Sequence, residues 1–433
     1  MSKNNNHFIA VIGGAVSGSV AASSLTEKGY QVVVIEQNAK PFGKIEDGLP
    51  KWHKRQREQE YEKINNRLNN PNIFYVPKTK LGKDIDFDEL VNELDFSAII
   101  LAIGASKDRP LMLDGLDNLE PNSFIYQNDF IHWFNHQDEI SQKNNIEIKD
   151  GAVIIGGGLA SIDVAKACQI DLFRQAIKNK LNKSLDIEEI ETLGIPKVCE
   201  KLNISYADLK LQGCTIIYRR NAEDMPLADL PNNANQNAKD KIKNVRKKIL
   251  NKAKDKFLFN FQSLASPSSL IINNNKLEGI LINKTVLIEG QVKVLDETIE
   301  LKTNQIISSI GSIPEPIKGI AMEGETFKVI DKSLGIYAEK EGVFLAGNVV
   351  TGKGNIRDSL KHAEKVADYV INSYLNPLDN QAGKQTADAV QSFLNKKESL
   401  NEQQFKKIIA KIHELQKKAN YHNNYNEWIA SSN

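Results

Sequence analysis

The feature that most constrains the fold of this chain is a pattern that occurs twice: an apolar strand, a glycine turn and a helix of small residues. The first copy covers residues 8–25 and the second covers residues 152–167. Each copy is completed further along the chain by an apolar strand that ends in Ile-Gly, at 98–104 and at 305–311. Two such copies predict two doubly wound α/β units within the 433 residues, each built on a parallel sheet.

The segments outside these copies predict three additions. Residues 171–212 separate the second glycine turn from its second strand and are expected to form a helical insertion. Residues 257–305 contain short alternating runs separated by turn residues, which is typical of an antiparallel β-meander. Residues 376–433 are polar with helical spacing, which predicts a helical C-terminal appendage. Three aromatic residues are expected to anchor this appendage: Tyr421, Tyr425 and Trp428.

The first glycine turn, residues 13–18, reads Gly-Gly-Ala-Val-Ser-Gly, with Ala15 at the middle glycine position of the G-x-G-x-x-G pattern. Such a turn lets the backbone approach a pyrophosphate, and the helix that follows offers free N–H groups and its dipole to the phosphates. The next strand ends at Glu36, 23 residues after Gly13. A carboxylate at this distance can bind a ribose 2′-hydroxyl and repels a 2′-phosphate. The first unit is therefore predicted to bind a dinucleotide without a 2′-phosphate.

The second glycine turn, residues 156–161, has serine in place of the third glycine. Where the first unit has a glutamate at the strand end, this unit has Arg219 and Arg220. The planar fork of arginine binds phosphate through two hydrogen bonds, so the pair indicates the 2′-phosphate of NADPH. The alternative is that both arginines pair with Glu223 and Asp224.

Composition limits the remaining function classes. The formal net charge of +1 argues against global attraction to nucleic acid or to an acidic membrane. No apolar run approaches the roughly 20 residues that span a bilayer, and the N-terminus has no secretory segment, so a cytoplasmic protein is expected. Cys168, Cys199 and Cys214 form no C-x-x-C pair and are too few to ligate the usual four-cysteine cluster. No metal site is expected.

With these residues in place, the chain resembles the adrenodoxin-reductase-like flavoproteins, which include bacterial ferredoxin–NADP reductases, over roughly residues 8–372. The small subunit of glutamate synthase is a more distant relative, and its cysteine-ligated cluster region is missing here. The resemblance rests on ordered segments: 41–43 and 48–50 with His53, the run 130–135, the run 158–165, Tyr218-Arg219-Arg220 with Met225-Pro226, and 342–347 followed by Gly352, Gly354 and Ile356.

The resemblance implies two Rossmann-like domains, an FAD domain (7–110 and 335–375) that is interrupted by an NADPH domain (111–334). Residues implied to contact FAD are Gly13, Ala15, Gly18, Glu36, Gly43, Gly48, Gly104, Gly347, Asn348, Gly354 and Ile356. Residues implied to contact NADPH are Gly156, Gly158, Leu159, Ala160, Arg219 and Arg220. His53 and Asp229 match the family's active-site histidine and glutamate, whereas Asn348 stands where relatives carry Asp or Trp.

The implied activity is hydride transfer from NADPH to FAD, followed by electron transfer to an external acceptor. A small acidic carrier, ferredoxin or flavodoxin, is the expected partner, because the chain has no dithiol or cluster of its own. Lys51, Lys54, Arg55 and Arg57 could form a basic docking rim for it. Two alternatives stay open: an NADPH-oxidising subunit of a larger complex or reductase of a small molecule, and a non-catalytic FAD-binding redox sensor.

Overall fold

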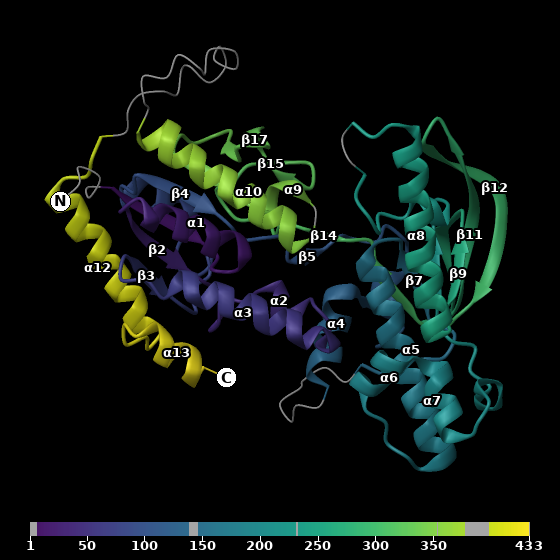
Figure 1. Ribbon diagram of the computed structural model, residues 1–433. Helices are drawn as coiled ribbons and strands as arrows, with labels where there is room; N and C mark the ends of the chain where they lie inside the picture. The colour runs from purple at the N-terminus through teal and green to yellow at the C-terminus, as the bar shows by residue number, and fades with distance from the viewer. Residues whose placement is uncertain (1–6, 138–145, 231–232, 353, 377–397, 433) are drawn as a thin grey trace. The chain divides into compact units, whose positions relative to one another are not determined.

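The computed structural model describes residues 7–137, 146–230, 233–352, 354–376 and 398–432 (Figure 1). The chain forms two compact units. The first contains residues 1–46, 54–107 and 312–433, and the second contains residues 47–53 and 108–311. Residues 312–334 therefore belong to the first unit and not with the second, and the short segment 47–53 packs within the second.

The first unit is built on a seven-stranded sheet in the order β17-β18-β19-β4-β1-β2-β3. Its strands are β1 (Phe8–Ile12), β2 (Gln31–Ile35), β3 (Ile73–Val76), β4 (Ala98–Leu101), β17 (Val329–Asp331), β18 (Ile336–Tyr337) and β19 (Val343–Leu345). From β19 to β3 all neighbours pair in parallel, while β17 and β18 add an antiparallel edge. Every residue of β1 is buried, as expected for a central strand that is covered on both faces. Because β17 belongs to this antiparallel edge, residues 329–334 lie in the first unit and not in the second, where they were predicted.

Helices cover both faces of this sheet. They are α1 (Val16–Glu27), α2 (Lys44–Asp47, at the end of the first stretch), α3 (Lys54–Leu68), α9 (Asn348–Thr351), α10 (Ile356–Tyr369), and the single-turn π-helical segments η2 (Glu89–Glu93) and η6 (Val370–Leu375). Helices α1 and α10 lie side by side (Figure 1) and share one apolar core with the inner face of the strands. The minor hairpin of β15 (Met322–Glu323) and β16 (Thr326–Phe327) also belongs to this unit.

The C-terminal helices α12 (Glu402–Lys418) and α13 (Tyr425–Ser431) pack along edge strand β3 (Figure 1). The rings of Tyr421 and Tyr425 meet that of Tyr75 edge to face, with centroids 5.8 and 5.1 Å apart. The indole of Trp428 donates a 2.7 Å hydrogen bond to the carbonyl of Ala39. The aromatic residues thus anchor the appendage as expected, and they cover an edge that could otherwise pair with another chain.

The second unit is built on a five-stranded parallel sheet in the order β6-β13-β7-β8-β9 and a three-stranded antiparallel sheet in the order β10-β11-β12. The strands of these two sheets are β6 (Phe124–Tyr126), β7 (Val153–Gly156), β8 (Thr215–Tyr218), β9 (Asn260–Ser263), β10 (Ala265–Asn273), β11 (Lys276–Ile288), β12 (Gln291–Lys302) and β13 (Ile306–Ser309). The antiparallel sheet is the expected meander, with one difference. Its first expected run, β9, instead pairs in parallel with β8 and extends the main sheet.

The helices of the second unit are α4 (Gln127–His136), α5 (Leu159–Leu181), α6 (Ile187–Leu193), α7 (Ile195–Leu202), α8 (Gln236–Phe257) and the 3-10 turns η1 (Lys51–His53), η4 (Tyr206–Leu209) and η5 (Ala222–Asp224). Helix α5 continues well past residue 171, where the insertion was expected to begin. It ends only at Asn182, whose left-handed backbone (φ 52°) caps it. No helix in the described ranges is long and apolar enough to cross a membrane.

Candidate dinucleotide-binding sites

The first glycine turn is held by close backbone contacts that exclude side chains. Gly13 donates its N–H to the carbonyl of Ile35 at 2.7 Å and has a φ of 95°. A Cβ on Gly18 would lie 1.7 Å from the carbonyl oxygen of Gly13. Helix α1 begins after Ala15 with no side-chain cap and no acidic residue in its first turn. The N–H groups and dipole at this end are therefore available to an anion.

Glu36 lies directly beside this turn. Glu36 is only 4% exposed, and its Oε2 accepts a hydrogen bond from the N–H of Gly14 at 2.8 Å. Its Oε1 accepts the N–H of Asn38 at 2.9 Å. The two bonds fix the carboxylate at the carboxyl end of β2, next to the turn that faces the phosphates, which is the position that reads a ribose.

The turn that follows β19 packs against the start of α1. Gly347 has a φ of 82° and a ψ of −142°, a region that only glycine adopts readily. A Cβ there would lie 1.9 Å from Oγ of Ser17, so these two positions are in direct contact within the first unit. The next residue, Asn348, has an Oδ1 that is buried and accepts no hydrogen bond among the described residues. Because buried polar atoms are normally satisfied, this oxygen indicates a missing donor, such as a bound ligand.

The other residues predicted to contact FAD are divided. Gly43 is close to the turn, since a Cβ on it would be 3.2 Å from Cβ of Ala15. Gly104 and Gly354 have open space where a Cβ would stand, and Ile356 begins α10. Gly48 belongs to the segment 47–53, which packs in the second unit.

The second glycine turn has the same local design. A Cβ on Gly156 would lie 2.2 Å from the carbonyl oxygen of Ser309, and one on Gly157 would lie 2.1 Å from the ring of Tyr218. Helix α5 begins after Gly158 without a side-chain cap or an acidic residue in its first turn, and Leu159 is exposed there. Ser161, in place of the third glycine, is fully buried and its hydroxyl lies 3.1 Å from the carbonyl oxygen of Ser309. The Ser161 side chain therefore links helix α5 to strand β13 by a hydrogen bond and does not act only as a spacer between them.

Arg219 and Arg220 follow β8, and the structure decides against the pairing that was their alternative role. Glu223 pairs with Lys247 at 2.7 Å, and Asp224 accepts a bond from the side chain of Asn221. Neither guanidinium makes a hydrogen bond or an ion pair within the described part of the chain. Arg219 is exposed and Arg220 is half-buried, so both can reach a phosphate.

His53 lies in a charged cluster with residues of α5 and α6. The ammonium of Lys166 is 3.5 Å from the carboxylate of Asp163, 3.4 Å from that of Glu191, and 4.5 Å from the ring centroid of Trp52. Burial lowers the pKa of His53, while Asp163 opposes that shift. Burial likewise raises the pKa of Asp163, against the attraction of Lys166 and His53.

Asp229, the other residue predicted to be catalytic, is exposed, and no described interaction joins it to His53. Sequence reasoning missed Asp163 as the acidic neighbour of His53. The sequence feature that could have identified Asp163 is its position in the first two turns of the helix that follows the second glycine turn.

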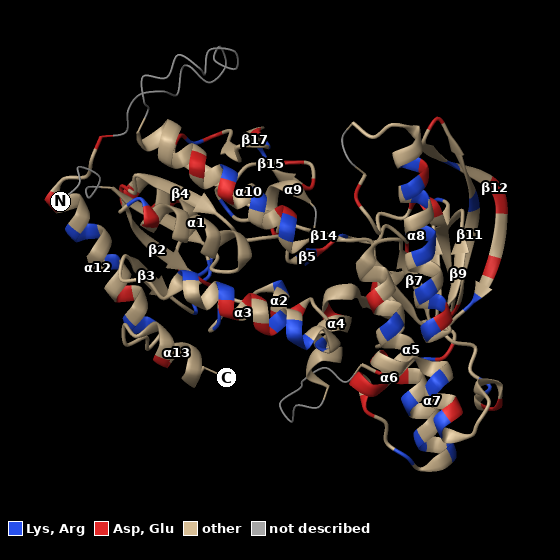
Figure 2. Cartoon of the chain, in the orientation of Figure 1, with Lys and Arg blue, Asp and Glu red and all other residues tan. Residues whose placement is uncertain are grey.

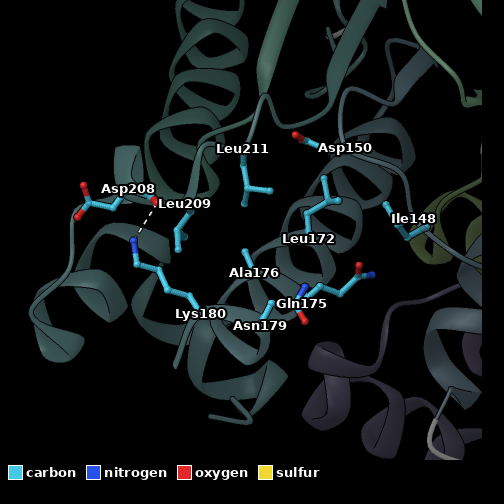
Figure 3. A pocket seen from close by; sticks show the side chains of 10 residues that line it. All are labelled: Ile148, Asp150, Leu172, Gln175, Ala176, Asn179, Lys180, Asp208, Leu209 and Leu211. Carbon is cyan, nitrogen blue, oxygen red and sulfur yellow. Dashed lines mark hydrogen bonds between the residues drawn. The ribbon is translucent and has the colours of Figure 1, made fainter. Parts of the chain in front are cut away.

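A hollow of about 460 Å³ in the second unit lies apart from these residues (Figure 3). It is lined by the later turns of α5, by η4 and by two loops, and the ammonium of Lys180 donates to the carbonyl of Asp208 across it. None of its lining residues belongs to either glycine turn or strand end, and it takes no part in the site.

The two parallel sheets, each with a glycine turn before a helix, have the design of two dinucleotide-binding units. Comparisons with known proteins agree. Residues 6–192 match the family model for pyridine nucleotide-disulphide oxidoreductases. The NADPH–ferredoxin reductase FprA of Mycobacterium leprae is 26% identical over 76% of this chain and 75% of its own length. The mitochondrial NADPH:adrenodoxin oxidoreductase of Arabidopsis thaliana is 28% identical over 36% of this chain and 32% of its own.

A solved structure, Mycobacterium tuberculosis FprA in complex with NADPH, shares the fold with a TM-score of 0.66. It is 20% identical in sequence, with 95% of this chain and 91% of that chain covered. The comparisons bear out the resemblance to the adrenodoxin-reductase-like flavoproteins that the sequence predicted. They also agree with the predicted class of enzyme, an NADPH-dependent oxidoreductase, since these relatives are named as NADPH-dependent reductases.

Proposed function

We propose that this chain takes electrons from NADPH and passes them, through FAD, to a small acidic carrier of the ferredoxin or flavodoxin type. The observation that carries the proposal is the opposite charge at the two equivalent strand ends. Glu36 is buried and held by two hydrogen bonds beside the first turn, whereas Arg219 and Arg220 form no ion pair with the described residues and lie beside the second. The two units share one backbone design, but Glu36 suits a ribose hydroxyl in the first unit, whereas Arg219 and Arg220 suit a 2′-phosphate in the second.

The residues of the first unit fit FAD. The uncapped start of α1 would hold the pyrophosphate, and Glu36 would hold the adenosine ribose. The buried Oδ1 of Asn348 would meet a donor of the flavin half. In the second unit, the start of α5 and the two arginines would hold NADPH. When bound, a flavin accepts a hydride and can release the two electrons singly, which suits a one-electron carrier.

The cysteines support an external acceptor. Cys168, Cys199 and Cys214 are all buried free thiols. A hydrogen bond with Cys214, together with burial, raises the pKa of Cys168, and burial raises the pKa of Cys199, which keeps both thiols protonated and unreactive. The chain therefore offers no exposed thiol pair through which electrons could leave.

Part of the predicted basic rim supports docking of an acidic carrier. Lys54 and Arg55 begin α3, a helix that carries several basic residues (blue in Figure 2). Both are exposed and form no ion pair among the described residues. Arg57, in contrast, donates to the hydroxyl of Tyr61 at 3.1 Å, and Lys51 belongs to the second unit. We therefore restrict the docking proposal to Lys54 and Arg55.

The test has two stages. The purified protein is first titrated with NADPH in the absence of air, and bleaching of the bound flavin is expected. Reduction of a ferredoxin, a flavodoxin and a neutral dye is then measured as ionic strength rises from ~0.01 to ~0.5 M. Carrier reduction should slow with salt, while dye reduction should barely change, because only the charged encounter is screened.

Charge reversal at Lys54 and Arg55 (K54E/R55E) should slow carrier reduction at low salt and leave NADPH oxidation with the dye unchanged. Lys28→Glu is a matched control. Lys28 is exposed and is the C-cap residue of α1. Thr26, two residues before it, accepts a hydrogen bond from the side-chain amide of Asn70, just beyond the C-terminal end of α3. Lys28 therefore lies near the end of α3 opposite to Lys54 and Arg55. If neither salt nor charge reversal matters, docking at α3 is wrong and a small-molecule acceptor or a larger complex is favoured. If NADPH fails to bleach the flavin, the whole proposal fails and the non-catalytic redox sensor is favoured.

A further inference from the structure

We propose that Asp47, His132 and His136 form a binding site for a divalent transition-metal ion, with Zn²⁺ as the probe of choice. Sequence reasoning expected no metal. The signal it passed over is the spacing of the two histidines on α4, because residues four apart in a helix lie on one face. A pair of histidines at this spacing is a recurrent way to hold zinc.

The third group comes from a different stretch of chain. Oδ1 of Asp47 lies 3.5 Å from Nδ1 of His132 and 3.9 Å from Nε2 of His136. The two imidazole rings are tilted by 40° to each other, with centroids 4.6 Å apart. All three ligand atoms lie within 4.8 Å of one another. Ligand atoms on one tetrahedral zinc ion, with bonds of about 2.0–2.1 Å, are separated by roughly 3.3 Å, so side-chain rotations that bring these atoms closer by up to about 1.5 Å close the site.

The segment that carries Asp47 is already held against α4. The side-chain amide of Asn135 donates a 3.1 Å hydrogen bond to the carbonyl of Leu49. The rings of Trp52 and Phe134 meet edge to face with centroids 5.3 Å apart. Both contacts lie within the second unit. The ligands are thus brought together before an ion binds, which lowers the entropic cost of assembling the site.

The ligand set decides which ion is bound. Two imidazole nitrogens and one carboxylate oxygen suit Zn²⁺, Ni²⁺, Cu²⁺ or Co²⁺, whereas Mg²⁺ and Ca²⁺ prefer oxygen ligands alone. Three protein ligands leave one position for water. The side chains of Asp47, His132 and His136 are 46%, 56% and 22% exposed, so an ion can enter from solvent. A bound ion would tie the segment 47–53, which carries His53, to α4.

The experiment is equilibrium dialysis of the FAD-loaded, untagged chain against Zn²⁺, with the bound metal counted by mass spectrometry, together with thermal unfolding with and without Zn²⁺. His132→Ala and Asp47→Asn are the test variants, since both side chains are largely exposed and their loss leaves no cavity. His413→Ala, an exposed histidine of α12, is the matched control.

We expect one Zn²⁺ per chain with micromolar affinity and a rise in unfolding temperature, since an ion that binds only the folded state stabilises it. His132→Ala and Asp47→Asn should weaken binding roughly tenfold or more and remove the thermal shift, while His413→Ala should keep both. Retained stoichiometry and thermal shift in His132→Ala, or no stoichiometric binding by the unaltered chain, would overturn the proposal. The readouts are independent of electron transfer, so the outcome does not depend on the proposed function.

Discussion

Replacing both arginines at the end of β8, in the variant R219A/R220A, should abolish most of the preference for NADPH over NADH. Neither guanidinium is engaged by another side chain in the described structure, so each is available to the 2′-phosphate. A hydrogen bond to a charged group contributes about 1.5–3 kcal/mol. Since Arg219 is exposed, solvent screens it and the lower figure applies. Two bonds then contribute about 3 kcal/mol, which corresponds to a preference of roughly 100-fold.

The assay is the steady-state kcat/KM for each nucleotide with an excess of a neutral dye, because this ratio reports binding of the transition state. The kcat/KM for NADPH should fall roughly 100-fold in R219A/R220A, while that for NADH should stay within a factor of about two. The variant K248A/K252A on α8 is the matched control, since both lysines are exposed and their loss removes the same two positive charges. The reasoning is refuted if R219A/R220A keeps its nucleotide preference, or if K248A/K252A loses as much.

Three further changes test the rest of the site. Gly347→Ala should lower the free energy of unfolding by at least about 1–3 kcal/mol in thermal unfolding, because its backbone conformation is strained for alanine and its Cβ meets Ser17. The variant S17G/G347A should recover only the part due to that clash, and full recovery would contradict the backbone argument. Trp428→Phe removes a neutral hydrogen bond to the loop after β2 and should speed FAD release about two- to tenfold, measured by flavin fluorescence. Asp163→Asn should lower the pKa of His53 further, since Asp163 now raises it. An NMR titration in which that pKa stays or rises would show that Asp163 does not act on the histidine.

Local patterns predicted much of this molecule. The glycine turns are visible in the sequence because close backbone approach needs glycine at fixed spacing, as the contact of Gly18 with Gly13 shows. The charge that distinguishes the two units is also local, since Glu36 and Arg219 each end the strand that follows a turn helix. The aromatic anchor of the appendage was visible as a cluster of large side chains in a polar segment.

Contacts between distant stretches of chain were not predictable in this way. Gly347 contacts Ser17, which is more than three hundred residues earlier in the chain. Ser161, on α5, donates a hydrogen bond to Ser309, on β13. The parallel pairing of β9 was missed because a single short run, 260–263, reads the same in a meander and in a parallel sheet. Such features depend on which strands become neighbours, and periodicity does not specify that.

His53 illustrates both the local sequence patterns and the contacts between distant stretches of chain. The sequence placed this histidine near the flavin by resemblance, yet its charge environment comes from Asp163 and Lys166, which stand on α5. That helix begins at Leu159, so both residues lie within two turns of the end where we propose that NADPH binds. A phosphate bound there adds negative charge, which favours the protonated imidazole in the same way that Asp163 does. Burial is the largest influence on the pKa of His53, and it lowers that pKa. The charges that adjust it stand in the second unit, on α6 and on the helix that opens the proposed nucleotide site, and not in the unit to which the sequence had assigned the histidine.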